Sequence, residues 1–306
     1  MTSGAVAPRR GFASALIPAM PWVFVVIWST GFVVARFGMP YAPPLTFLSM
    51  RYGFSLACFL IWIAVSGVEW PRERAQWLHL AVVGVLIQAG YLGGVWAAVK
   101  DGIGAGTVAL LVGLQPVLTA LWMTWSTRGA DGAHARVSKQ QWLGLVLGLA
   151  GLALVVWHKL GGGEVTHRNL ALAIFALLSI TIGTLYQKRY VAPCDVRTAS
   201  AVQLFAALVV SLPLALLETE SVVWHVHMIG AMAWSVLVLT LGGSSLLYLL
   251  IQRGAATSVT SLMYLVPPCT AVLAWLLFGE LFTWSMLVGM ALTATGVALV
   301  VRAGAR

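Results

Sequence analysis

Long apolar stretches follow one another along almost the whole chain, separated by short polar interruptions. A helix needs about 20 apolar residues to cross roughly 30 Å of hydrocarbon, and uninterrupted runs of this length are typical of membrane-spanning helices. Only Arg51 is charged well inside such a run. We therefore predict ten transmembrane helices, at residues 18–35, 44–66, 77–99, 103–125, 141–157, 169–187, 198–217, 229–251, 255–278 and 283–301.

The composition supports an all-α integral membrane protein. Of the 306 residues, 60% are hydrophobic and 9% are charged, and the mean hydropathy is +0.92. A soluble domain carries about 25% charged residues, so this chain cannot cover itself with a polar surface. Ten helices with short loops use nearly the whole sequence and leave no room for a sizeable soluble domain.

The lysines and arginines predict the orientation. With a cytoplasmic N-terminus, 13 of the 18 lie on the cytoplasmic side and 4 on the outer side, with Arg51 inside the membrane. Cytoplasmic loops carry an excess of Lys and Arg, so both termini are predicted to be cytoplasmic, with residues 1–17 as a short N-terminal segment. The net charge of +9 then reflects these loops, and no basic helix face indicates nucleic acid.

The chain contains an internal duplication. Residues 142–156 align with 287–301 at an offset of 145, with two glycines in register. The fourth and ninth helices align at 151, with Pro116 on Pro267, and the first and sixth at 152, with Gly31 on Gly183. Each half holds five helices, an odd number, so the second half enters the membrane in the opposite sense. Inverted repeats are typical of transporters with a midplane binding site.

The run from Trp28 to Arg36, followed by Ala42 to Arg51, resembles the opening of EamA-type members of the drug/metabolite transporter superfamily. Pro116, Pro267 and the Gly279-Glu280 pair are also similar to that family. The resemblance covers about residues 20–302, as two EamA repeats at 18–158 and 168–302. It implies ten helices, cytoplasmic termini and export or exchange of small metabolites such as amino acids in the bacterial inner membrane.

Other chemistry is not indicated by the sequence. There is no Walker loop, so no direct use of ATP and no ATPase partner is implied. The three cysteines are far apart and form no CxxC motif, and the pair His225 and His227 is better explained as solvated side chains than as metal ligands. We predict no cofactor, no metal and no enzymatic activity. No acidic residue lies within a predicted helix, which favours neutral or zwitterionic solutes over proton coupling through a membrane carboxylate.

Arg51 lies about 7 residues into the second helix, roughly 10 Å deep at 1.5 Å per residue. Two interpretations stay open. The guanidinium is either a structural group that pairs with helix-end carbonyls or a contact for an anionic group of the substrate.

Polar and aromatic side chains recur at spacings of 3 and 4 on the third, sixth, eighth and ninth helices, which places each set on one helix face. Such stripes either line a shared polar cavity or pack helices together. The predicted substrate-binding residues are Trp28, Ser29, Gln88, Tyr91, Trp96, Gln115, Tyr186, Ser245, Tyr248, Ser261 and Tyr264. Pro116 and Pro267 each remove a helix hydrogen bond and are predicted as hinges, with fixed kinks as the alternative.

The leading interpretation is a secondary transporter of small organic metabolites that works by alternating access, as a monomer or homodimer. A lipid-linked sugar flippase and a proton-coupled drug exporter of the same superfamily are alternatives. A membrane-embedded enzyme would need an acid/base pair or metal set, and the sequence offers neither.

The charge count makes a topology prediction. A cysteine at position 131, on a background without Cys58, Cys194 and Cys269, should react with an impermeant thiol reagent only after the cells are opened. Labelling in intact cells would contradict the orientation.

Overall fold

The computed structural model describes residues 20–126, 138–161, 163–246, 265–280 and 283–304, and within these ranges the secondary structure is entirely helical. The predicted N-terminal segment 1–17 and the short join at 252–254 lie outside the described residues. Eight helices are long and apolar enough to cross a membrane, and two shorter apolar helices follow them. The prediction of ten helices is therefore confirmed.

The first repeat contains α2 (Met20–Gly38), α3 (Pro44–Ser66), α4 (Arg74–Val83), η2 (Gly84–Leu92), α5 (Gly93–Lys100), α6 (Ala105–Val112), α7 (Gln115–Ser126) and α8 (Lys139–Gly161). The second repeat contains α9 (His167–Tyr190), α10 (Val196–Ala215), α11 (Val226–Ala233), η3 (Trp234–Gly242), α14 (Val266–Phe278) and α15 (Trp284–Gly304). The elements α4, η2 and α5 form one continuous rod, as do α11 and η3.

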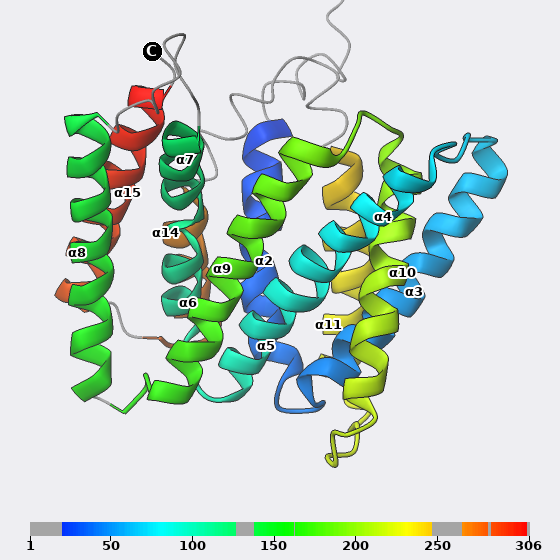
Figure 1. Cartoon of the computed structure of the whole chain (residues 1–306). Coiled ribbons are helices and arrows are strands. Elements are labelled where there is room, and N and C mark those ends of the chain that lie inside the picture. The colour runs from blue at the N-terminus through cyan, green and yellow to red at the C-terminus, as the bar shows by residue number, and fades with distance from the viewer. Residues whose placement is uncertain (1–19, 127–137, 162, 247–264, 281–282, 305–306) are drawn as a thin grey trace, which may run out of the picture.

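Successive helices run in alternating directions (Figure 1). The start of α2 and the end of α15 lie at one end of the bundle, which we call the terminal end, and the other end is the opposite end. Helix α2 starts at the terminal end, whereas α9, the first helix of the second repeat, starts at the opposite end. The second repeat therefore enters the bundle inverted, as an odd number of helices per repeat requires.

Helices α8 and α15 pack against each other through reciprocal glycine contacts. A Cβ at Gly144 would collide with the carbonyl oxygen of Gly296, and a Cβ at Gly151 would collide with that of Gly289. Gly144 and Gly289 are equivalent in the duplication, as are Gly151 and Gly296. Each contact therefore pairs a glycine of one repeat with the glycine that is not its equivalent, and the two contacts are related by the symmetry of the repeats. These glycines thus join the last helix of each repeat, because helix backbones approach closely where side chains are small.

At the starts of the equivalent helices α3 and α10, carboxylates accept backbone N–H groups that have no partner within the helix. Helix α3 begins with Pro44 at its first position, which suits a site where no N–H is needed. The carboxylate of Glu218 accepts the next two backbone N–H groups, from Leu45 at 3.0 Å and Thr46 at 2.7 Å. At the start of α10, Asp195 accepts the backbone N–H of Arg197 and pairs with its guanidinium, and this hydrogen bonding lowers the pKa of Asp195.

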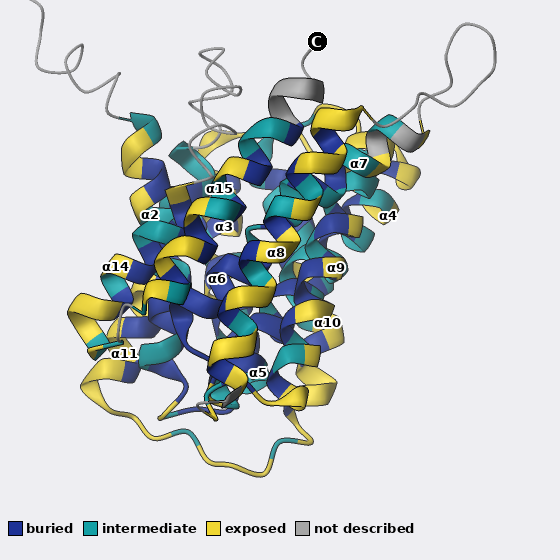
Figure 2. Ribbon diagram, turned by 90° about the vertical axis from the view of Figure 1, so that its left-hand side faces the viewer, coloured by how far each residue is buried: buried dark blue, intermediate teal, exposed yellow. Residues whose placement is uncertain are grey.

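The outer surface is apolar where helices face away from the bundle. Figure 2 shows exposed positions along the outer sides of the helices and buried positions between them. Trp157 of α8 is 80% exposed and Phe175 of α9 is 53% exposed. A monomeric soluble protein rarely exposes apolar patches on this scale, so lipid tails are the solvent for this surface.

The glycine contacts generate a stability prediction. Gly144→Ala should destabilise the protein by about 1–3 kcal/mol, because the added methyl overpacks the α8–α15 contact. Thermal unfolding of the detergent-solubilised protein measures the effect. The matched control is Gly53→Ala in α3, where nothing lies within 4 Å of the added methyl and Ala is the better helix former. Equal loss of stability in both variants would contradict the reciprocal packing.

Candidate functional site

Two π-helices interrupt equivalent helices of the two repeats. Both η2 and η3 are nine residues long, and their bounds, Gly84–Leu92 and Trp234–Gly242, lie 150 residues apart. The sequence predicts regular α-helix at both places, and the wider turn rotates Gly84, Gln88 and Tyr91 off a single α-helical stripe. π-helical segments are rare and are frequent at functional sites, so the residues of η2 and η3 and their neighbours on α3 form the candidate site.

Local contacts support the wider turns. In η3 the hydroxyl of Thr240 donates to the carbonyl oxygen of Ser235, five residues earlier, at 2.8 Å. Such a side-chain bond competes with the regular helix ladder. In η2 the absence of a side chain at Gly84 lets the backbone of α10 at Gln203 occupy the place of a Cβ. A side-chain hydrogen bond therefore supports η3, and close packing against the backbone of α10 supports η2.

Arg51 of α3 lies against η3. Its Nε and Nη2 atoms donate to the hydroxyl oxygen of Thr240 at 3.3 and 3.1 Å. The residue is 7% exposed. Among the described residues every ion pair involves other groups, so the Arg51 guanidinium has one hydroxyl partner and no carboxylate. The predicted pairing with helix-end carbonyls is not found in this part of the chain.

The residue after Arg51 connects α3 to the other π-helix. The hydroxyl of Tyr52 donates to the carbonyl oxygen of Gln88 in η2 at 2.6 Å. Tyr91 of η2 is also buried and lies close enough to Arg51 for an electrostatic interaction. One turn of α3 thus contacts both π-helices: Arg51 bonds to Thr240 of η3, and Tyr52 bonds to the backbone of Gln88 in η2.

The predicted residues of α2 lie at a helix interface. Ser29 is fully buried, and its hydroxyl donates to the carbonyl oxygen of Val25 at 2.7 Å. Its own carbonyl oxygen accepts the hydroxyl of Thr270 in α14 at 3.2 Å. Trp28 is half-buried and its ring lies 5.4 Å from that of Phe24. Ser29 therefore joins helices of the two repeats.

Two other predicted aromatic residues lie away from Arg51. Trp96 is 1% exposed and stacks on Phe47, with ring centroids 4.5 Å apart. The hydroxyl of Tyr186 lies 2.9 Å from Nδ1 of His79 near the start of α4. His79 precedes Tyr91 by twelve residues on one rod, which is more than two helical turns. The structure thus places Tyr91 and Tyr186 at different depths.

Gln115 connects the repeats near the break between α6 and α7. Its amide nitrogen donates to the hydroxyls of Thr119 at 3.2 Å and Thr184 at 3.3 Å. Thr184 belongs to α9, so this amide reaches from the first repeat into the second.

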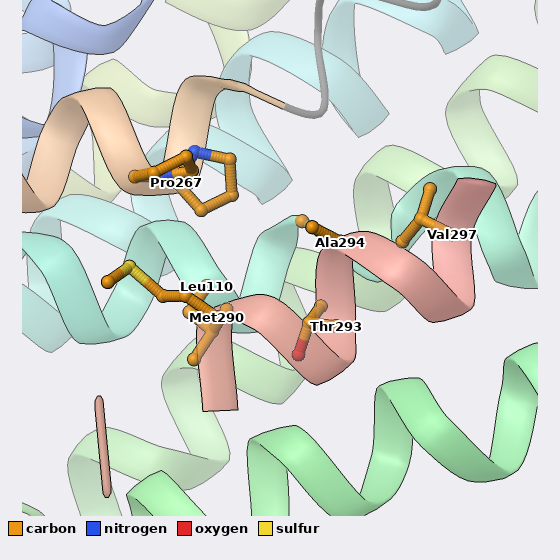
Figure 3. A pocket seen from close by; sticks show the side chains of 8 residues that line it. Leu110, Pro267, Met290, Thr293, Ala294 and Val297 are labelled. Carbon is orange, nitrogen blue, oxygen red and sulfur yellow. The ribbon is translucent and has the colours of Figure 1, made fainter. Parts of the chain in front are cut away.

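The two predicted hinge prolines occupy the same position in equivalent helices. Pro116 is the second residue of α7, and Pro267 is the second residue of α14. The first repeat has a helix break at residues 113–114, directly before α7. Pro267 and Gly113 line a cavity of about 20 Å³, whose other side is formed by α15 residues including Met290 and Thr293 (Figure 3). This volume is about that of one water-sized sphere, so the packing is slack beside this proline.

The remaining predicted residues lie near or beyond a gap in the description. The hydroxyl of Ser245 donates to the carbonyl oxygen of Leu241 at 2.6 Å. Tyr248, Ser261 and Tyr264 lie outside the described residues. The shared cavity lined by all four stripes therefore stays a prediction.

A polar cluster at the opposite end was missed by the sequence analysis. Glu164 accepts the backbone N–H of Gly104 at 3.0 Å, and Glu280 accepts that of Ala105 at 3.2 Å. Lys159 pairs with Glu164 at 2.7 Å, and Arg36 lies 3.8 Å from Glu280. Both carboxylates come from the second repeat and its connection, whereas the capped helix α6 belongs to the first. No spacing rule indicates this, because each carboxylate is at least 60 positions away from the backbone N–H group that it accepts.

Metal-binding chemistry finds no support in the described ranges, where no group of three or more His, Cys, Asp or Glu side chains could hold an ion. His225 stacks on Tyr41 with ring centroids 4.6 Å apart, and His227 lies 3.3 Å from the Tyr41 hydroxyl. These histidines contact an aromatic residue of the first repeat, which gives them a packing role.

Comparison with known proteins identifies the family. The EamA-like transporter family matches residues 19–157 and, a second time, residues 168–302. The chain belongs to this family. EamA proteins are transporters and not enzymes, so the match confirms the resemblance, the duplication and the expectation of a membrane transporter.

Curated relatives are distant but cover most of the chain. The "Uncharacterized transporter YvbV" of Bacillus subtilis is 26% identical over 90% of this chain and 88% of its own length. A "Probable amino-acid metabolite efflux pump" of Salmonella typhimurium is 25% identical over 94% and 93%. The "Uncharacterized inner membrane transporter YedA" of Escherichia coli is 25% identical over 87% and 84%. A crystal structure that is 18% identical covers 94% of this chain and 98% of its own with a TM-score of 0.63, which supports the fold.

The capping cluster generates a prediction for Gly104. A Cβ there would lie 2.6 Å from Oε1 of Glu164 and 2.8 Å from Oε2 of Glu280, so Gly104→Ala must displace both carboxylates from the start of α6. A cysteine replacing the buried Val108 should then react faster with an impermeant thiol reagent. The control is Gly230→Ala, where nothing lies within 4 Å of the added methyl. Unchanged reactivity in Gly104→Ala would show that the cluster does not close this end.

Proposed function

We propose that the protein is a secondary transporter that exports or exchanges small organic metabolites, such as amino acids, across the bacterial inner membrane. The membrane transporter class follows from the family. The solute class is supported by the relatives from Salmonella and Escherichia coli named as amino-acid metabolite efflux pumps. The inner-membrane location is supported by the name of the YedA relative.

The observation that carries the proposal is the buried Arg51 between two matched π-helices. A charged side chain within a membrane helix is costly and is by default a functional-site hypothesis. The π-helices belong to equivalent helices of inverted repeats, and the binding sites of such transporters lie near the midplane at the repeat interface. A solute bound there would contact both repeats at once.

Alternating access is supported by a difference between equivalent contacts. A Cβ at Gly183 would lie 2.6 Å from Ile87 of η2, whereas a Cβ at the equivalent Gly31 would lie 3.9 Å from Leu239 of η3. The same interface is therefore tight in one copy and looser in the other. In alternating access, each of two equivalent interfaces is closely packed in one state and loosely packed in the other. Any single state therefore has one tight and one loose interface.

Counterflow in proteoliposomes tests the function. Vesicles loaded with an unlabelled amino acid mixture should accumulate the matching labelled amino acid only when they contain the protein, with no ATP present. Repeating the assay with a pH gradient distinguishes exchange from proton coupling. Failure to move any member of an amino acid and organic acid panel would contradict the proposal.

The prolines generate a prediction about mechanism. Pro116→Ala and Pro267→Ala each restore a backbone N–H at the second residue of α7 and α14, where it can bond to a carbonyl of the preceding turn and extend the helix. One such hydrogen bond contributes about 0.5–1.5 kcal/mol net. This shifts a two-state population about 2- to 13-fold at 1.4 kcal/mol per decade. Because the repeats are inverted, we expect shifts in opposite directions.

Spin-label distances across each end of the bundle measure these shifts. Leu118→Ala, two residues after Pro116 in α7, is the control that leaves the backbone donors and the Gln115 contacts unchanged. Shifts of the same sign, or none in either variant, would reduce both prolines to fixed kinks.

A further inference from the structure

The connection between α2 and α3 contacts the start of α11 at the opposite end of the bundle. The ring of Tyr41 stacks on that of His225, with centroids 4.6 Å apart and planes 4° from parallel. The Tyr41 hydroxyl lies 3.3 Å from Nδ1 of His227, and the Tyr41 carbonyl oxygen accepts the backbone N–H of Val223 at 2.8 Å. Tyr41 belongs to the first repeat and its partners belong to the second. We call Tyr41, His225 and His227 the Tyr41 contact, and it joins the two repeats.

The Tyr41 contact lies at an interface that occurs twice. Helix α2 packs on the α11–η3 rod as α9 packs on the α4–η2–α5 rod. At the terminal end of the second copy, Nδ1 of His79 lies 2.9 Å from the hydroxyl of Tyr186, and the His79 ring stacks on Tyr190. These are the interfaces whose glycine contacts, at Gly31 and Gly183, differ in tightness. The Tyr41 contact therefore belongs to an interface whose packing alternating access would change.

His225 also caps the helix that it precedes. It is the N-cap residue of α11, and its Nδ1 accepts the backbone N–H of His227 at 3.2 Å. An imidazole nitrogen that accepts a hydrogen bond carries no proton. One edge of the ring thus caps α11 while one face stacks on Tyr41, and a single ring orientation serves both. The Tyr41 contact therefore requires Nδ1 of His225 to be unprotonated.

A proton on His225 acts against this arrangement in three ways. It removes the capping acceptor, and it places a positive charge at the positive end of the helix dipole. The ring of His227 lies only 4.8 Å from that of His225, so two charged rings repel each other. A charged imidazole over the Tyr41 ring gains a cation–π attraction, which alone favours the opposite result. The three losses are each of similar size to this one gain, so protonation weakens the contact.

The charged groups on the surrounding elements already have partners. Arg36 at the end of α2 lies 3.8 Å from Glu280, and Lys100 at the end of α5 bonds to Glu220 at 2.6 Å. Glu218, in the connection before α11, accepts two backbone N–H groups at the start of α3. Histidine is the side chain that ordinarily changes charge between pH 5 and 8. The two histidines are therefore the groups of this neighbourhood that respond in that range.

We propose that the Tyr41 contact is a pH-sensitive latch, which holds the repeats together at the opposite end when its histidines are neutral and releases them when the histidines are protonated. The count of lysines and arginines predicts that this end faces the outside of the cell, so acidification outside favours opening on that side. The latch goes beyond the proposed transport function and can be tested without a transported solute.

The experiment measures spin-label distances in the full-length, detergent-solubilised protein at about pH 8 and about pH 5.5, on the two sides of the histidine range. The labels are attached to Trp157→Cys on α8 and Ile229→Cys on α11, which are exposed positions in different repeats, on a background without the three native cysteines. We expect the ratio of the longer to the shorter distance to rise about 3- to 10-fold at the lower pH. This lies within the range that loss of an N-cap acceptor gives.

Variants of His225 separate the proton from the ring. Asparagine is a good N-cap residue and does not titrate, so His225→Asn should stay closed at both pH values and lose most of the response. His225→Ala removes the acceptor at every pH and should be open at both. The matched control is His167→Gln, at an exposed histidine that begins α9 at the same end, and it should keep the full response.

Thermal unfolding at each pH identifies the variants that are folded. His225→Asn is the mildest change and keeps the test valid if His225→Ala does not fold. Four results would overturn the latch: no change of distance with pH in the unaltered contact, closing instead of opening at low pH, an unchanged response in folded His225→Asn, or a lost response in His167→Gln.

The latch and the transport function fail separately. If the distances respond to pH through His225 but no solute undergoes counterflow, the latch stands and the transport function is rejected. If counterflow occurs but the distances do not respond to pH, the transport function stands and the latch is rejected.

Discussion

A helix that crosses a bilayer must satisfy its own backbone hydrogen bonds, because lipid tails supply neither donors nor acceptors. This constraint explains why the regular secondary structure of the described residues is helical and why several helix starts and one widened turn have a polar partner inside the protein. Glu218 meets the free N–H groups at the start of α3. Glu164 and Glu280 do the same at the start of α6. At η3 the hydroxyl of Thr240 takes up a carbonyl of the widened turn.

The same constraint determines where polar side chains lie in the bundle. Lipid-facing positions carry tryptophan, leucine and valine, while serine, threonine and the single intramembrane arginine lie inside. Polar contacts then join the two repeats repeatedly. Ser29 contacts Thr270, Gln115 contacts Thr184, and Arg51 contacts Thr240. These contacts are single hydrogen bonds, which suits the relative movement of the repeats that the proposed transport cycle requires.

The helices pack more closely in one part of the bundle than in another. Helices α8 and α15 meet through backbone contacts that only glycine permits, and such an interface has little freedom. Around η2 and η3 the equivalent contacts differ in tightness, and Pro267 borders a small cavity. A closely packed pair at one side and unequal interfaces around the candidate site are the arrangement that a rocking bundle requires.

The sequence by itself determined the number of helices, the approximate positions of those that the structure describes and the inverted duplication. Apolar run length is a direct measure of membrane thickness, and the second predicted helix, 44–66, coincides with α3. It also singled out Arg51, because an intramembrane charge stands out in any apolar run. Glycines in register at an offset of 145 indicated the duplication, and the structure shows that they form the α8–α15 contact, where close approach restricts side-chain size.

Tertiary structure alone decided which polar residues meet. The stripe on α9 faces η2 through Ser179 and Gly183, and spacing cannot distinguish such a packing face from a cavity wall. The π-helices were not predictable from a 3.6-residue period, because they depend on neighbours such as the α10 backbone at Gly84. The partners of Arg51, Glu164 and Glu280 lie far away in sequence. Sequence periodicity describes one helix at a time, whereas these contacts arise only when helices of both repeats are brought together.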